Sequence, residues 1–230
     1  MTPETFEQNF QKLCSESQAD GRFTPSRDIW SPRLDEDTQQ LTWDQHYIYH
    51  TGWASRVLAA TRPAKHVDIA SLNFWAVAVS AFIPMEFYEF RPMPCKGLSS
   101  FVCGEANLTS LPFADNSIDS LSSLHTLEHI GLGRYGDAVD ASGDRKAAAE
   151  LVRVLAPGGQ LLMAVPCGKP RLIYNMGRVY SYQMVVDMFY PLKVAEFALW
   201  TDDPQEFILN ADPALVAKCE GGCGCWRFVK

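Results

Sequence analysis

The chain has 230 residues, of which 47% are hydrophobic and 20% are charged, and its formal net charge is −7. This length and composition are typical of a globular protein with a full core and argue against disorder. The negative charge disfavours nucleic acid or an anionic membrane surface as the main partner.

Three further features predict a cytoplasmic protein. The opening MTPETFEQNF is polar and acidic, unlike a signal peptide. The longest apolar run, residues 74–83, is too short to span a bilayer. The seven cysteines are odd in number and spread along the chain, which favours reduced thiols over a disulfide framework.

Residues 1–60 are predicted to form a helical or irregular cap segment ahead of one α/β domain at 61–230. Between residues 44 and 60, aromatic and aliphatic side chains recur near helical spacing, which favours a helix packed over the sheet. A second interpretation makes one aromatic side chain of this segment a lid over a bound ligand. The candidates for that lid are Tyr47, Tyr49 and Trp53.

The rest of the chain alternates apolar runs with helical patterns. The predicted strands are 66–70, 85–90, 101–103, 118–124, 161–165, 194–200 and 225–229. The predicted helices are 73–83, 143–156, 181–189 and 213–218. Such alternation predicts an α/β fold with a seven-stranded, mostly parallel sheet, helices on both faces and a last antiparallel strand at one edge.

One connection is unusually short. Only residues 91–100 separate the second predicted strand from the third, whereas a helical crossover needs about a dozen residues or more. We therefore expect a shortened, extended connection without a helix at this point.

Acidic side chains follow the second and third predicted strands. Glu89 is placed to accept two hydrogen bonds from a ribose diol. Glu105 could accept one from the exocyclic amine of adenine, while a backbone N–H near Ala106 meets a ring nitrogen. The chain lacks G-x-G-x-x-G and G-x-x-x-x-G-K-[ST], which disfavours a dinucleotide-dependent dehydrogenase. Adenosine without a pyrophosphate cradle points to S-adenosyl-L-methionine.

Five motifs in register carry a family resemblance over residues 101–165. They are Glu105-Ala106, Leu111-Pro112-Phe113, Asp115-Asn116-Ser117-Ile118-Asp119, Leu127-Glu128-His129 and Arg153-Val154-Leu155-Ala156-Pro157-Gly158-Gly159. In this order and spacing they resemble class I S-adenosylmethionine-dependent methyltransferases, of the methyltransferase type 11 kind. The stretch His129–Asp137 is similar to the methyltransferase-like domain of unknown function 268. The resemblance implies a Rossmann-like class I methyltransferase fold.

The resemblance also implies a cofactor site for S-adenosyl-L-methionine. The loop from Asp68 to Leu72 would contact the methionine part of the cofactor, Glu89 its ribose, and Glu105 with Ala106 its adenine. The complete cofactor-binding set is Asp68, Ala70, Ser71, Glu89, Arg91, Glu105, Ala106 and Leu124. The chain departs from the family at Ala70-Ser71-Leu72-Asn73, where most members have a Gly-x-Gly loop that lets backbone approach the ligand.

The acceptor half of the site is predicted between His125 and Asp137. His125 follows the fourth strand, where a neutral imidazole could act as general base, or it is a structural histidine. Glu128 and His129 are further catalytic candidates, although His129 could instead tie a loop to the sheet. The glycine-rich segment 131–137 is predicted to be a rigid loop over the pocket mouth. The substrate-binding candidates are Arg134, Tyr135, Asp137 and Tyr47.

No metal site is predicted. The spacing of His125, Glu128, His129 and Asp137 matches no strong ligand pattern. Cys219, Cys223 and Cys225 lack an evident fourth ligand, and a tight turn explains the glycines around them equally well.

These features predict a methyltransferase that uses S-adenosyl-L-methionine to methylate an oxygen or nitrogen of a small molecule or sugar. In-line positioning of the two reactants would supply most of the catalysis, with His125 as the candidate base. The alternative is a methyltransferase-like binding or regulatory protein without transfer activity, supported by the non-glycine loop and the short connection at 91–100. The oligomeric state is not predicted.

Overall fold

The computed structural model describes residues 1–21, 23–35, 43–92 and 94–230. The chain divides into two compact units, 1–43 and 44–230. The first unit contains helix α1 (Pro3–Asp20), which begins where the Thr2 side chain accepts a hydrogen bond from the backbone N–H of Thr5. A short 3-10 helix, η1 (Arg27–Ile29), follows.

Helix α2 (Gln45–Thr61) is part of the second unit. It begins at Asp44, whose carboxylate accepts from the backbone N–H of His46 at 3.0 Å. Its apolar face, which includes Trp53 and Leu58, is buried. The boundary between the two units therefore lies before α2.

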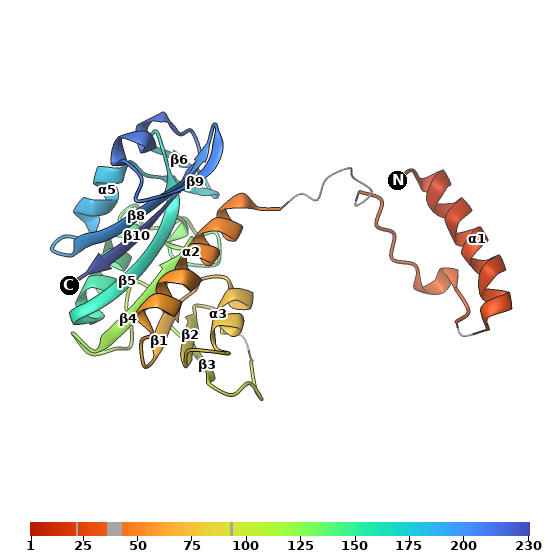
Figure 1. The fold of residues 1–230 in the computed structure, drawn as a ribbon, viewed down its shortest axis with the longest axis horizontal. Coiled ribbons are helices and arrows are strands. Elements are labelled where there is room, and N and C mark those ends of the chain that lie inside the picture. Colours follow the sequence, from red (N-terminus) through yellow and green to blue (C-terminus); the bar gives the residue numbers. More distant parts are fainter. Residues whose placement is uncertain (22, 36–42, 93) are drawn as a thin grey trace. The chain divides into compact units, whose positions relative to one another are not determined.

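The second unit is built on one eight-stranded sheet, with strand order β3-β2-β1-β4-β5-β10-β8-β9 (Figure 1). The first five strands of that order are parallel, and β10, β8 and β9 pair antiparallel to their neighbours. The strands are β1 (His66–Ile69), β2 (Met85–Glu89), β3 (Phe101–Glu105), β4 (Ile118–Leu124), β5 (Leu155–Cys167), β8 (Lys193–Asp202), β9 (Gln205–Leu209) and β10 (Gly222–Val229).

The predicted α/β fold, mostly parallel with an antiparallel last strand, is confirmed, and two details are corrected. The sheet has an eighth strand, β9, which forms a hairpin with β8 and was missed by the sequence pattern. The last strand, β10, lies between β5 and β8 rather than at the edge. It can occupy that place because it is buried almost throughout and hydrogen-bonds on both sides.

Helices cover both faces of the sheet, as predicted. Figure 1 shows α2 and α3 (Asn73–Val79) on one side and α5 (Tyr182–Met188) on the other. Helix α4 (Gly143–Val154) shares the core of the α5 side. Side chains of β5 alternate between the two cores: Leu161 and Met163 face α4, and Leu162 faces α2 and α3.

The connection between β2 and β3 contains no helix in its described residues, 90–92 and 94–100, so the predicted shortened connection is confirmed. The remaining elements are short. They are the 3-10 helices η2 (Leu127–His129) and η3 (Pro213–Lys218) and the hairpin of β6 (Arg171–Ile173) with β7 (Gly177–Val179). Among the described residues, no helix combines the length and hydropathy needed to cross a bilayer.

Candidate functional site

A cavity of about 610 Å³ lies where the parallel strands end. Its walls come from the segments that follow β1, β2, β3 and β4, together with Tyr47 of α2 and the loop beyond η2. In open parallel sheets, ligands bind at these carboxyl ends, and the volume is in the range of small-molecule sites. The cavity is therefore the candidate ligand site.

Most of the predicted site residues line this cavity, and four do not. The lining residues among them are Tyr47, Ala70, Ser71, Glu89, Arg91, Ala106, Leu124, His125, His129, Tyr135 and Asp137. The four outside the lining are Asp68, Glu105, Glu128 and Arg134. Sequence reasoning missed Asn73, Phe90, Asn107, Thr109, Thr126 and Asp140, which also line it.

Asp68 supports the cavity wall from behind. Its carboxylate is fully buried and accepts hydrogen bonds from the Ser71 backbone N–H at 3.0 Å and hydroxyl at 2.6 Å. The Ser71 hydroxyl in turn accepts from the backbone N–H of Leu124 at 2.8 Å. Burial raises the pKa of Asp68 to about 6, although the hydrogen bonds from Ser122 and Ser71 act in the opposite direction. Asp68 thus fixes the loop after β1.

The next residue of that loop has a backbone conformation that normally belongs to glycine. Ala70 has a φ of 60°, in the left-handed region, which costs a residue with a Cβ roughly 1–2 kcal/mol. Its backbone N–H donates to the carbonyl oxygen of Tyr88 at 2.8 Å, which holds the turn in place. Ala70 therefore adopts the backbone conformation of a glycine turn although it carries a Cβ atom.

Replacing Ala70 by glycine is therefore expected to raise the free energy of unfolding by about 1 kcal/mol, because the left-handed strain disappears. Urea denaturation of the full chain measures the change. The matched control is Ala59→Gly at an exposed position of α2, which should lower stability by about 1 kcal/mol. Equal destabilisation by both substitutions would contradict the assignment of strain to Ala70.

The acidic residues at the ends of β2 and β3 differ in their relation to the cavity. Glu89 lines it, and its carboxylate accepts from the backbone N–H of Phe90 at 2.9 Å. Glu105 pairs with Glu89 in the sheet register but lies outside the lining. The backbone N–H of Ala106 already donates to the Glu89 carbonyl at 3.2 Å. Glu89 is thus the cavity's own acidic side chain at the β2 end.

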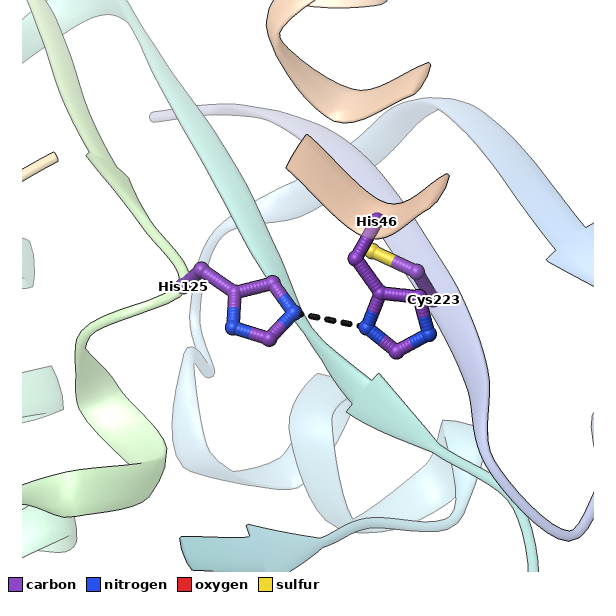
Figure 2. Close-up of side chains that lie close together, drawn as sticks. All are labelled: His46, His125 and Cys223. Atoms are coloured by element: carbon purple, nitrogen blue, oxygen red, sulfur yellow. Dashed lines mark hydrogen bonds between the residues drawn. The ribbon is translucent and has the colours of Figure 1, made fainter. Parts of the chain in front are cut away.

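His125 makes polar contacts with both of its ring nitrogens, and Figure 2 shows the contact with His46. Its Nδ1 lies 2.5 Å from Glu128 Oε1, and its Nε2 lies 2.9 Å from Nδ1 of His46. The other nitrogen of His46, Nε2, is 2.9 Å from the carbonyl oxygen of Gly221. A carbonyl only accepts hydrogen bonds, so His46 carries its proton on Nε2 and its Nδ1 is a bare acceptor. His125 Nε2 must then carry a proton, and its Nδ1, at ion-pair distance from the Glu128 carboxylate, carries one as well, which makes His125 an imidazolium.

The pKa shifts agree with that assignment. Burial alone lowers the pKa of His125, but the Glu128 charge and hydrogen bonds with Cys223 and Glu128 raise it well above its usual value. For Glu128, burial raises the pKa, and the His125 charge and hydrogen bond bring it below its usual value. Burial and the His125 charge lower the pKa of His46. The group is a neutral His46 beside a buried His125–Glu128 ion pair.

Helix α2 contributes two histidines that sequence reasoning missed, His46 and His50. His50 is fully buried and stacks on His125 with ring centroids 5.3 Å apart. Neither of its ring nitrogens has a hydrogen-bond partner within the described part of the chain. The sequence signal that could have found them was their spacing, because residues four apart lie on one face of a helix. Tyr47, between them in the sequence, was predicted, and its ring lies 5.2 Å from that of His125.

His129 lines the cavity on the far side of Glu128. Its Nε2 is 3.7 Å from Glu128 Oε1, and its Nδ1 is 3.4 Å from the Arg134 guanidinium. Burial lowers the pKa of His129, and the Arg134 charge adds to that effect while Glu128 opposes it. His129 is consequently a neutral imidazole at pH 7.

The loop 131–137 is held from inside by one carboxylate. Asp137 accepts from the backbone N–H groups of Gly131 at 2.8 Å and Tyr135 at 3.2 Å. Gly131 has a φ of 80°, and a Cβ there would lie 2.1 Å from the Asp140 carbonyl oxygen. The guanidinium groups of Arg91 and Arg134 each lie 5.0 Å from the centroid of the Tyr135 ring. Two cations therefore flank the aromatic side chain at the cavity rim.

The strand order, the antiparallel β10 and the cavity beyond the parallel strands define a Rossmann-like class I methyltransferase fold. Within it, residues 99–211 match the family described as a Caenorhabditis protein of unknown function, DUF268. This match confirms the resemblance identified from the sequence. None of the curated proteins matches the chain.

Solved structures share the fold at low sequence identity. The N-methyltransferase NodS from Bradyrhizobium japonicum, solved with S-adenosyl-L-homocysteine, is 16% identical, with a TM-score of 0.56 over 95% of this chain and 96% of its own. A candidate sarcosine dimethylglycine methyltransferase from Galdieria sulphuraria is 14% identical, with a TM-score of 0.56 over 79% and 85%. The cyclase SpnF is 14% identical, with a TM-score of 0.52 over 85% and 84%. At these identities the likeness shows the fold alone.

Proposed function

We propose that this protein is an S-adenosyl-L-methionine-dependent methyltransferase that methylates an oxygen or nitrogen of a small molecule or sugar. The observation that carries the proposal is the cavity of about 610 Å³ at the strand ends of a class I methyltransferase fold, with Glu89 at the end of β2. Its volume suits a cofactor with a small acceptor beside it.

The residues at the strand ends fit this cofactor. The turn at Ala70 and Ser71 would meet its methionine part, and the Glu89 carboxylate would accept from the ribose hydroxyls. Arg91, Ala106 and Leu124 complete the lining there. The bound cofactor supplies an electrophilic methyl group. Asp68 would act indirectly, by fixing the position of Ser71. Glu105 does not line the cavity, and its contact with adenine stays a prediction.

The acceptor is proposed to bind between Tyr47 and the loop 131–137. Tyr47 and Tyr135 both line the cavity. Arg91 and Arg134 at the Tyr135 ring favour an acceptor that carries a carboxylate or phosphate group. Holding the acceptor atom in line with the methyl group would supply most of the rate enhancement.

For the proton of a hydroxyl or ammonium acceptor, we place the general base at His129. The sequence favoured His125, but its Nε2 faces the bare Nδ1 of His46 at 2.9 Å and its Nδ1 forms an ion pair with the Glu128 carboxylate at 2.5 Å, so neither nitrogen has a lone pair to offer. His129 lines the same cavity as a neutral imidazole. Its Nδ1 lone pair accepts the long, 3.4 Å contact from the Arg134 guanidinium, and in this proposal the acceptor displaces that contact before His129 takes the proton. In this proposal Glu128 and His125 position the segment that carries His129.

Calorimetric titration of the full chain with S-adenosyl-L-methionine and S-adenosyl-L-homocysteine tests the cofactor site. Both ligands are expected to bind, and Glu89→Ala should weaken each by about tenfold or more, because a carboxylate hydrogen bond contributes roughly 1.5–3 kcal/mol. Glu206→Ala, an exposed change on β9, is the matched control and should bind as the wild type does. Absence of heat from both ligands would overturn the proposal.

The second candidate is a binding or regulatory module without methyl transfer. The strained Ala70 in place of glycine favours it, and SpnF illustrates that a protein of this fold can be named for another reaction. Tight binding of both cofactor forms with no exchange of a labelled methyl group, across oxygen and nitrogen acceptors, would favour this module.

A further inference from the structure

Three metal-ligand side chains meet beside the cavity from elements that are distant in the chain. They are His46 of α2, His125 after β4 and Cys223 of β10 (Figure 2). One nitrogen or sulfur atom of each lies within 4.8 Å of those of the other two. No sequence motif links them, because the fold alone brings them together.

The outer nitrogen of each histidine is already held by an acceptor. His46 Nε2 donates to the Gly221 carbonyl at 2.9 Å, and His125 Nδ1 contacts the Glu128 carboxylate at 2.5 Å. Metal-binding histidines nearly always donate their second ring N–H to a carbonyl or carboxylate in this way. The inner nitrogens, His46 Nδ1 and His125 Nε2, therefore point toward one another, 2.9 Å apart.

Cys223 supplies a thiol on the same side. It is fully buried, is not in a disulfide, and its sulfur lies within 4.8 Å of the ligand nitrogens of both histidines. Cys219 and Cys225, which the sequence groups with it, belong to no metal-ligand cluster found among the described residues. The combination of two imidazoles with one thiol is the ligand set preferred by Zn²⁺, Co²⁺ and copper rather than by Mg²⁺ or Ca²⁺.

The local charge is also suited to a divalent cation. Without metal, the His125 imidazolium balances the Glu128 carboxylate. A divalent cation would form bonds to His46 Nδ1, His125 Nε2 and Cys223 Sγ and release two protons to solvent, one from His125 Nε2 and one from the thiol. Because the two positive charges of the metal ion replace two protons, the net charge of this buried group stays the same. Metal binding therefore places no uncompensated charge in the protein interior.

We propose that His46, His125 and Cys223 form a binding site for Zn²⁺ or a chemically similar divalent transition metal, with Gly221 and Glu128 orienting the two imidazoles. The fourth coordination position is left to water or to a ligand. The site joins α2, the β4 loop and β10, and so holds the neighbouring Tyr47 against the cavity. The proposal depends on the cluster alone and does not require methyltransferase activity.

Cobalt titration of the chelator-treated full chain tests the site. One equivalent of Co²⁺ should bind and give the visible absorption of a four-coordinate ion and a thiolate-to-cobalt charge-transfer band in the near ultraviolet. One equivalent of Zn²⁺ should abolish both signals by displacement. Failure to bind one equivalent of either ion at micromolar concentration would overturn the proposal.

Variants identify the ligands. Cys223→Ser should remove the charge-transfer band, and His46→Gln should weaken Zn²⁺ binding at least a hundredfold. Glu128→Gln should weaken it by about 10- to 100-fold through the orientation of His125. The matched controls are Cys225→Ser, two residues further along β10, and His50→Gln, on the same helix face as His46; both should bind as the wild type does.

X-ray absorption of the zinc-loaded wild type keeps the test decisive if a variant fails to fold. The expected first shell contains one sulfur and two imidazole nitrogens. A shell of nitrogen and oxygen alone, a charge-transfer band that persists in Cys223→Ser, or an equal loss of the band in Cys225→Ser would each overturn the assignment.

Discussion

Glu128→Gln is expected to lower the free energy of unfolding by about 3 kcal/mol or more, because it leaves the buried His125 without its counter-charge. The Glu128 carboxylate is fully buried and lies 2.5 Å from His125 Nδ1. Urea denaturation with a chelator present, at pH 6, measures the change. At that pH the His125–Glu128 pair is ionised in the fold, given the direction of both pKa shifts.

An exposed ion pair provides the control. Glu86→Gln removes the partner of Lys65, whose ammonium lies 2.7 Å from the carboxylate at the surface, and should change stability by less than about 1 kcal/mol. The double variant His125→Gln with Glu128→Gln removes both charges and should recover part of the loss. A cost for Glu128→Gln no larger than that of Glu86→Gln would contradict the buried ion pair.

His129→Asn is expected to lower the turnover number by about 100-fold or more, the contribution of a positioned general base, with little change in cofactor affinity. The wild-type rate should fall as the pH drops through the pKa of His129, which lies below its usual value, because the protonated imidazole cannot accept a proton. In His129→Asn that acid limb should disappear. Single-turnover rates across pH, with calorimetry for the cofactor, measure both effects.

The matching variant of His125 tests the alternative that His125, and not His129, is the general base. If His129→Asn keeps its rate and its acid limb, while a folded His125→Gln loses both, the base is His125, as the sequence predicted. Loss of folding in His125→Gln would fit its place in the ion pair and leave the His129 result to decide. Arg134→Lys is a useful comparison, because it keeps the charge near His129 and should leave the position of the acid limb almost unchanged.

The sheet was largely predictable where its strands are apolar runs bounded by turn residues. Residues 161–165, LLMAV, for example, lie within β5 as expected. The missed strand β9 is short, half exposed, and separated from β8 by only Asp203 and Pro204, so its pattern merges with that of the previous run. The interior place of β10 depends on long-range pairing, which no local pattern encodes.

The candidate site was predictable only in part, for the same reason. The residues after β1, β2 and β4 follow from the rule that strand ends meet at one edge, and eleven of the fifteen predicted site residues line the cavity. The contact between His46 and His125 spans 79 residues and begins on a helix whose docking the sequence does not encode. The protonation of His125 follows from the Gly221 carbonyl, which is visible only in the folded chain.

The place of β10 in the sheet also sets an order of assembly during synthesis. The ribosome delivers β10 after every other strand of the sheet, yet β10 joins β5 on one side to β8 on the other. Until it emerges, no strand is present to join the β8–β9 hairpin to the five parallel strands. Cys223 arrives with it, so the cavity wall around His125 is completed only after the two parts of the sheet are joined.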